Sequence, residues 1–198
     1  MRPLILFAPG AGAPSSSPWM RGWAERLATL ARVVAFDYPY ARDGRKRPDP
    51  RPRLVAAHRE ALAAARGPAG SGPVVLAGKS MGGRIGCHVA LEEPVDALVC
   101  LGYPLRGASG VLRDEVLLGL KTPILFVQGT RDPLCPLDKL DEVRGRMTAK
   151  SFLHVVDGGD HSLLLLQREL RARGQTQADV DALTHDTIAA FFRQVLRG

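Results

Sequence analysis

Apolar residues along this 198-residue chain gather into six short runs, separated by longer stretches in which apolar positions recur at helical spacing. The runs are almost continuously apolar and mostly end at Gly, Pro or Asp, which is typical of strands covered on both faces. The predicted strands span residues 4–8, 33–37, 74–77, 97–101, 124–128 and 151–156. The predicted helices span residues 19–30, 54–66, 81–91, 111–118, 138–147 and 178–196. Thr176 and Asp179 have the spacing of a capping box at the start of the last helix.

Alternation of strands and helices predicts an α/β protein with a mostly parallel sheet and helices on both faces. The length favours a single domain over residues 1–198. We expect the strand order 2-1-3-4-5-6, which reverses beside strand 1. That reversal places a crevice at the carboxyl ends of strands 1 and 3, where open sheets bind ligands.

The sequence argues against a membrane-spanning protein, a secreted protein and a cysteine-bound zinc site. No apolar run approaches the length needed to cross a bilayer, and the apolar segment at the N-terminus is shorter than that of a signal peptide. We therefore expect a cytoplasmic protein with no membrane partner. Three widely spaced cysteines without a CxxC pair indicate neither a disulfide framework nor a zinc site.

Much of the formal net charge of +7 comes from one Pro-rich segment, residues 42–53, which holds six Lys or Arg and two Asp. A solvated loop is one interpretation. The other is a rim that attracts an acidic substrate or nucleic acid. Aromatic residues are absent from this segment, so we do not expect a base-stacking surface or a nucleic-acid partner. The sequence does not indicate an oligomeric state.

The strongest chemical signal is Gly78-Lys79-Ser80-Met81-Gly82, which runs from a predicted strand into a predicted helix. This context suits a nucleophile elbow, a sharp turn that lifts a serine above the sheet. We expect any side chain at Gly78 or Gly82 to collide with the neighbouring strand or helix.

A serine hydroxyl needs a base to take its proton. His161 follows the last strand, at the same sheet edge as Ser80, whereas the other four histidines lie within predicted helices or a strand. Asp132, on the loop after strand 5, is the expected acceptor on the far side of the imidazole. Asp157 is its nearest rival and Asp37, after strand 2, a more distant one, whereas Asp160 adjoins His161 and is poorly placed to reach its ring. Ser80, Asp132 and His161 follow the chain order of α/β-hydrolases.

The oxyanion of the reaction requires two N–H donors. We expect the backbone N–H of Met81, at the start of a helix, and that of Ala11, on the glycine-rich loop after strand 1. No cofactor or metal is expected, because a Walker A motif, HExxH and clustered Cys and His are all missing from the sequence.

These segments resemble small α/β-hydrolases of the dienelactone-hydrolase-like kind over essentially the whole chain. The most similar group is a compact one that bears Gly-Lys-Ser-Met-Gly-Gly-Arg and includes testis-expressed hydrolase-like proteins and a chromatin-complex subunit domain. The resemblance is carried by residues 10–14, 78–84, 101–105, 128–133 and 158–162. It implies a hydrolase fold with Ser80, Asp132 and His161 in the triad positions. Relatives tend to have His-Gly before the oxyanion residue where this chain has Pro9-Gly10, a change that a backbone donor can survive.

The sequence predicts an open site, because only about twenty residues separate strands 4 and 5, too few for a cap domain. Tyr103 is a candidate lining residue, and Lys79 or Arg84 is a candidate to hold an anionic group on the substrate. The alternative for these cations is a side chain that only supports the turn. We expect a serine hydrolase that cleaves a small ester or thioester. The alternative is a non-catalytic hydrolase-like module that binds a partner protein. Retention of Ser80, Asp132 and His161 argues against this alternative, because a scaffold without catalytic function would be free to lose one of them.

Overall fold

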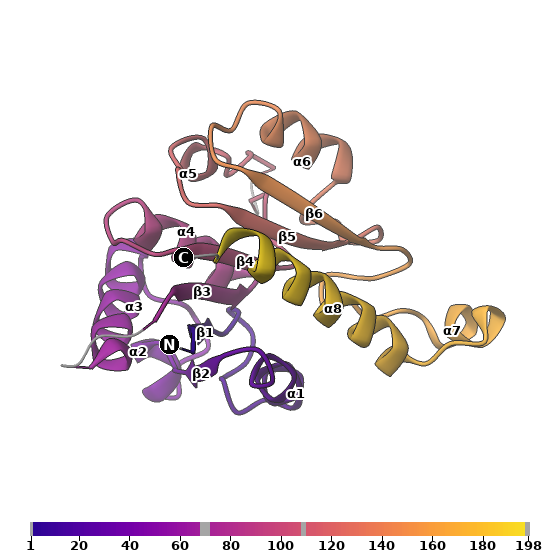
Figure 1. The fold of residues 1–198 in the computed structure, drawn as a ribbon, viewed down its shortest axis with the longest axis horizontal. Coiled ribbons are helices and arrows are strands. Elements are labelled where there is room, and N and C mark those ends of the chain that lie inside the picture. The colour runs from indigo at the N-terminus through magenta and orange to yellow at the C-terminus, as the bar shows by residue number, and fades with distance from the viewer. Residues whose placement is uncertain (1, 68–71, 108–109, 197–198) are drawn as a thin grey trace.

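The computed structural model describes residues 2–67, 72–107 and 110–196 and contains one six-stranded sheet. All its strand pairs are parallel, and the strand order is β2-β1-β3-β4-β5-β6 (Figure 1). The strands are β1 (Leu4–Ala8), β2 (Arg32–Ala35), β3 (Val74–Lys79), β4 (Ala97–Leu101), β5 (Ile124–Gly129) and β6 (Ser151–Val156). The predicted α/β class and strand order are therefore confirmed.

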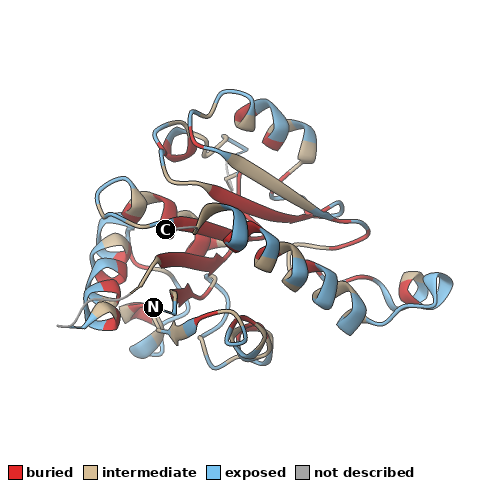
Figure 2. Ribbon diagram, in the orientation of Figure 1, coloured by how far each residue is buried: buried red, intermediate tan, exposed pale blue. Residues whose placement is uncertain are grey.

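Strand residues alternate between two apolar cores, one on each side of the sheet. In β1, Leu4 and Leu6 pack on one side, whereas Ile5 and Phe7 pack on the other. The first side is covered by α3 (Arg51–Arg66), α4 (Met81–Ala90), α5 (Glu115–Leu118) and α6 (Leu137–Arg144). The second is covered by α1 (Pro18–Leu27) and α8 (Gln177–Val195), joined at its edge by α7 (Gln167–Arg173). Figure 2 shows the central strands buried between these layers.

The register of the sheet decides which loops meet. Ala8 at the end of β1 pairs with Gly78 near the end of β3, so the loop after β1 starts beside Ser80. Gly129 at the end of β5 pairs with Val156 at the end of β6, which places the two following loops together. Parallel strands thus bring four loops to one sheet edge.

Element bounds differ from the sequence prediction mainly where tertiary contacts intervene. β2 stops at Ala35, and the carboxylate of Asp37 just beyond it accepts hydrogen bonds from Ser15. The helix predicted over 111–118 is shortened to α5, because Leu112 instead forms an antiparallel bridge with Arg106. Residues 108 and 109 in this connection lie outside the described residues.

Two short helices were not predicted, α2 (Pro39–Arg42) and α7, because four and seven residues are too few to show a period. Apart from α5, the other helices match within three residues at each end. The capping box of Thr176 and Asp179 is present at the start of α8. As expected, the described part of the connection between β4 and β5 holds only the four-residue helix α5 and forms no cap domain. Across the described ranges, no helix is both long enough and apolar enough to span a bilayer.

Candidate active site

Ser80 occupies the sharp turn between β3 and α4. Its backbone has φ 49° and ψ −114°, a conformation that side-chain-bearing residues rarely adopt. A Cβ added to Gly78 would lie 2.3 Å from the nitrogen of Gly83, and one added to Gly82 would lie 2.4 Å from the carbonyl oxygen of Ala8. The expected collisions with helix and strand are confirmed, so both glycines are required for this turn.

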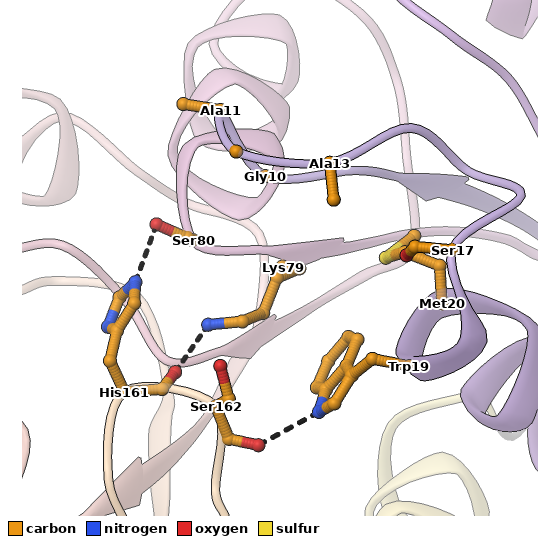
Figure 3. A pocket seen from close by; sticks show the side chains of 11 residues that line it. Gly10, Ala11, Ala13, Ser17, Trp19, Met20, Lys79, Ser80, His161 and Ser162 are labelled. Carbon is orange, nitrogen blue, oxygen red and sulfur yellow. Dashed lines mark hydrogen bonds between the residues drawn. The ribbon is translucent and has the colours of Figure 1, made fainter.

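A continuous line of hydrogen bonds joins three loops at the carboxyl edge of the sheet. The Oγ atom of Ser80 lies 2.8 Å from Nε2 of His161, a hydrogen bond drawn as a dashed line in Figure 3. On the other side of the ring, Nδ1 of His161 lies 2.7 Å from Oδ2 of Asp132. A carboxylate on Nδ1 favours the imidazole tautomer whose Nε2 can accept the serine proton. The arrangement can therefore activate a hydroxyl as a nucleophile.

Asp132 is held in place by more than His161. Its side chain is fully buried, and Oδ1 accepts a hydrogen bond of 2.9 Å from the backbone N–H of Leu134. Oδ2 also accepts from the side-chain amide of Gln128, a buried residue of β5. These donors keep the carboxylate oriented toward the imidazole.

The rival aspartates have other partners. Asp157 is exposed and forms an ion pair of 2.8 Å with Arg173. Asp160, next to His161, accepts from the backbone N–H groups of Ser162 and Leu164 and so shapes its own loop. Asp37, the most distant rival, binds Ser15.

A cavity of about 360 Å³ opens beside Ser80 and His161 (Figure 3). One wall is the loop after β1, where a Cβ on Gly10 would lie only 3.6 Å from Cβ of Ser80. The other described lining residues come from that loop, from α1, from the end of β3 and from the loop after β6: Ala11, Gly12, Ala13, Ser17, Trp19, Met20, Lys79 and Ser162. Small and apolar residues dominate the walls, so the cavity suits a small, mostly apolar group.

Of the two expected oxyanion donors, one lies at this cavity and the other at the turn that follows Ser80. Ala11 is one of the lining residues. Met81 is the first residue of α4, so its N–H has no carbonyl partner within the helix. Its side chain packs away in a small core with Tyr38 and Ile85.

Lys79 is buried, with only 9% of its surface exposed, although it lines the cavity. Its Nζ donates a hydrogen bond to the carbonyl oxygen of His161 and lies 5.5 Å from the ring centre of Trp19. Burial lowers the pKa of Lys79 to about 8, against the opposing effect of Asp132 and Asp160. The side chain therefore holds the His161 loop and also brings a cation to the cavity wall.

A family model described as an alpha/beta hydrolase domain matches residues 1–193. The chain belongs to this family.

Solved structures share the fold of this hydrolase. Est1E from Butyrivibrio proteoclasticus, solved with ferulic acid bound, superposes with a TM-score of 0.72 at 14% identity, over 98% of this chain and 89% of that one. A dienelactone hydrolase from Anabaena variabilis gives 0.71 at 20% identity, over 99% and 88% of the two chains. An alpha-beta serine hydrolase homologue from Coxiella burnetii gives 0.68 at 20% identity, over 81% and 76%.

Two residues proposed from the sequence do not reach the cavity of this hydrolase. Tyr103 is fully buried, stacks edge-on against Phe126 and donates its hydroxyl to the carbonyl oxygen of Arg113. The chain turns at Gly102, whose φ is 68°, so the ring points into the core and the prediction that Tyr103 lines the substrate site is wrong. Arg84, one helical turn beyond Ser80, lines a different hollow and is also not a cavity residue.

Sequence reasoning missed the residues that hold the loop after β1. The hydroxyl of Tyr40, in α2, lies 3.4 Å from the carbonyl oxygens of both Gly10 and Ala11. Asp37 accepts from the backbone N–H of Ser15 at 2.6 Å and from its hydroxyl at 3.0 Å. These contacts span more than twenty residues, and no local motif announces them.

The basic segment 42–53 is organised around one buried carboxylate. Asp49 pairs with Arg45 at 2.9 Å and with Arg53 at 3.5 Å, and it also accepts from the backbone N–H of Tyr40. Part of the positive charge is therefore used to fix α2 next to the loop after β1. Within the described ranges, no cluster of three or more His, Cys, Asp or Glu could hold a metal ion.

Proposed function

We propose that this α/β hydrolase is a serine hydrolase that cleaves a small carboxylic ester or thioester through an acyl-enzyme intermediate. The single observation that carries the proposal is the hydrogen-bonded line from Ser80 Oγ through His161 to the buried carboxylate of Asp132. Within the family, we place the chain with the dienelactone-hydrolase-like members that bear Gly-Lys-Ser-Met-Gly-Gly-Arg.

In the first half of the proposed reaction, His161 takes the proton of Ser80 as Oγ bonds to the acyl carbon. The carbonyl oxygen becomes an oxyanion and accepts hydrogen bonds from the N–H groups of Met81 and Ala11. Its collapse breaks the bond to the alcohol or thiol, which leaves with the proton from His161.

In the second half, water takes the place of the leaving group. His161 removes a proton from the water as its oxygen bonds to the acyl carbon, and the second oxyanion uses the same two donors. Collapse returns the proton to Ser80 and releases the carboxylic acid. Asp132 stays ionised and stabilises the imidazolium in both halves.

The cavity supports a small acyl group rather than a long lipid chain. Its volume is about 360 Å³, at the lower end of what small-molecule sites occupy, and its walls near Ser80 are Gly10, Ala11, Gly12 and Ala13. The described connection between β4 and β5 contributes no cap that would enclose a long chain.

Labelling with a fluorophosphonate tests the proposal directly, because the probe bonds covalently to an activated serine. We expect the wild type to be labelled and Ser80→Ala to be unlabelled. Ser162→Ala is the matched control, since Ser162 lines the same cavity, whereas the imidazole forms its hydrogen bonds with Ser80 and Asp132. Across the three proteins, the extent of labelling should parallel the rate of hydrolysis of short p-nitrophenyl esters.

Two outcomes contradict the proposal. Equal labelling of wild type and Ser80→Ala would place the reactive group elsewhere. A folded wild type that neither reacts with the probe nor hydrolyses short esters would favour the non-catalytic, partner-binding alternative.

A further inference from the structure

Three arginines from separate parts of the fold line one small hollow on the face of the sheet that α3, α4, α5 and α6 cover. The hollow measures about 140 Å³ and lies among α3, α4 and the segment before α5. Arg51 begins α3, Arg84 lies in α4, and Arg113 precedes α5. Figure 1 shows α3 and α4 side by side. We call this hollow the arginine pocket; its other lining residues are His88, Leu112, Glu115 and Val116.

The arginines of this pocket lack the carboxylate partners that some other arginines of the described residues have. Arg59, for example, forms ion pairs with Glu92 and Glu93. Within the described residues, no carboxylate lies within 4.0 Å of the guanidinium nitrogens of Arg51, Arg84 or Arg113. The Nε atom of Arg84 is buried and has no hydrogen-bond partner there. Buried hydrogen-bond donors are rarely left without an acceptor in folded proteins, so the pocket has a donor available for a ligand.

Charge in the pocket is also unbalanced. Burial lowers the pKa of Arg84, and the guanidinium groups of Arg113 and Arg51 lower it further, which reflects their mutual repulsion. Burial, Arg51 and Arg84 together lower the pKa of His88 to about 4, so this ring is neutral near pH 7. Among the described lining residues, Glu115 is the single carboxylate, and it is exposed. Gathered like charges destabilise a fold unless an opposite charge joins them.

We propose that the arginine pocket binds the phosphate group of a phosphorylated small molecule. Guanidinium groups present planar pairs of N–H donors that match phosphate oxygens, and three of them suit a dianion better than a monovalent carboxylate. The positive end of the α3 dipole lies beside Arg51 and adds to the attraction.

A larger groove provides room for the rest of the ligand. It measures about 520 Å³ and shares Arg51, His88, Glu115 and Val116 with the arginine pocket. Its remaining lining is partly apolar, with Pro52, Val55, Ala56 and Leu91. A phosphate ester with a compact, partly apolar body therefore fits the combined surface.

This site is separate from the candidate active site. The arginine pocket and the cavity beside Ser80 have no described lining residue in common. Binding to the pocket can therefore be tested whether or not the protein hydrolyses esters.

Titration calorimetry with phenyl phosphate, at low salt and neutral pH, tests the proposal. We expect saturable binding by the wild type and affinity at least about tenfold weaker in Arg113→Gln and in Arg84→Gln, because each loses charge-assisted hydrogen bonds. Arg21→Gln is the matched control: it removes the same charge from exposed α1, which covers the other face of the sheet, and should bind like the wild type. Benzoate and inorganic phosphate, run in parallel, separate the phosphate from the body of the probe.

Arg113 is the safer of the two positions if Arg84→Gln is unstable, since Arg113 lies in the segment before α5 and not in a helix. The proposal is overturned if the wild type does not bind phenyl phosphate, or if Arg113→Gln binds it as tightly as Arg21→Gln does. If benzoate bound as tightly as phenyl phosphate, the proposal that the pocket recognises a phosphate group would be overturned. We expect inorganic phosphate to bind more weakly than phenyl phosphate, and at least about tenfold more weakly to Arg113→Gln than to the wild type.

Discussion

At the scale of single residues, Lys79 connects the turn at Ser80 to the cavity beside it. It directly precedes Ser80, yet its ammonium reaches across to the carbonyl oxygen of His161 and to the ring of Trp19. An ammonium has three N–H donors, so the contact with His161 leaves capacity for a group in the cavity. Trp19 supports the same loop from the other side, donating its indole N–H to the carbonyl oxygen of Ser162 at 2.9 Å.

Lys79 should make the enzyme prefer esters that carry a carboxylate, in a pH-dependent way. Since burial lowers the pKa of Lys79 to about 8, the cation is present below that pH and is lost above it. The ratio of kcat/KM for a succinyl ester to that for a neutral butyryl ester should therefore fall between pH 7 and pH 9. In Lys79→Met the ratio should be lower by about tenfold at pH 7 and should not change with pH.

Taking the ratio of two substrates in the same protein cancels any common effect of the substitution on His161. An unchanged ratio in Lys79→Met would show that Lys79 only supports the turn.

At the scale of elements, the loop after β1 depends on α2. Asp49 fixes the start of α2 through the N–H of Tyr40, and the Tyr40 hydroxyl contacts the carbonyl oxygens of Gly10 and Ala11. Asp37 holds the same loop further along, at Ser15. A four-residue helix thus positions the proposed oxyanion donor of Ala11, although no residue of α2 lines the cavity beside Ser80.

Tyr40→Phe should lower kcat by about tenfold with little change in KM, because a displaced Ala11 N–H weakens the transition state more than substrate binding. Tyr38→Phe is the matched control, since the buried hydroxyl of Tyr38 contacts His58 instead of the loop. Steady-state kinetics with a short p-nitrophenyl ester measures both constants. Equal effects of the two substitutions on kcat would refute a positioning role for Tyr40.

At the scale of the whole molecule, the candidate site depends on how closely α4 approaches the sheet. Gly82 and Gly83 on α4 lie against the ends of β1 and β3, where the absence of side chains allows backbone to contact backbone. Any added atom there must push α4 away from the sheet, because protein interiors are close-packed.

Gly82→Ala should therefore lower the free energy of unfolding by at least about 3 kcal/mol, since its Cβ would lie 2.4 Å from the carbonyl oxygen of Ala8. Gly145→Ala is the matched control, because its Cβ would meet nothing closer than 3.5 Å and its backbone is already helical. We expect the control to stay within about 1 kcal/mol of the wild type. Urea unfolding of the three proteins measures the difference, and a stable Gly82→Ala would mean that α4 can move without cost.

Much of the fold was predictable because its signals are local. Short apolar runs, helical spacing and the glycines of the elbow are properties of neighbouring residues, and they predicted all six strands and the strand order. The same patterns placed Ser80, Asp132 and His161 after strand ends at one sheet edge, where the structure brings them into contact. The short helices α2 and α7 carry too few residues for such a signal.

Sequence alone thus determined the architecture and the edge of the sheet at which polar side chains meet, since both follow from strand pattern and chain order. Only the tertiary structure decided where individual side chains point. In the structure the Tyr103 ring lies in the core, Arg84 lines the arginine pocket and the Tyr40 hydroxyl contacts the loop after β1. The physical reason is that these orientations are set by packing between residues far apart in the chain, which no local pattern encodes.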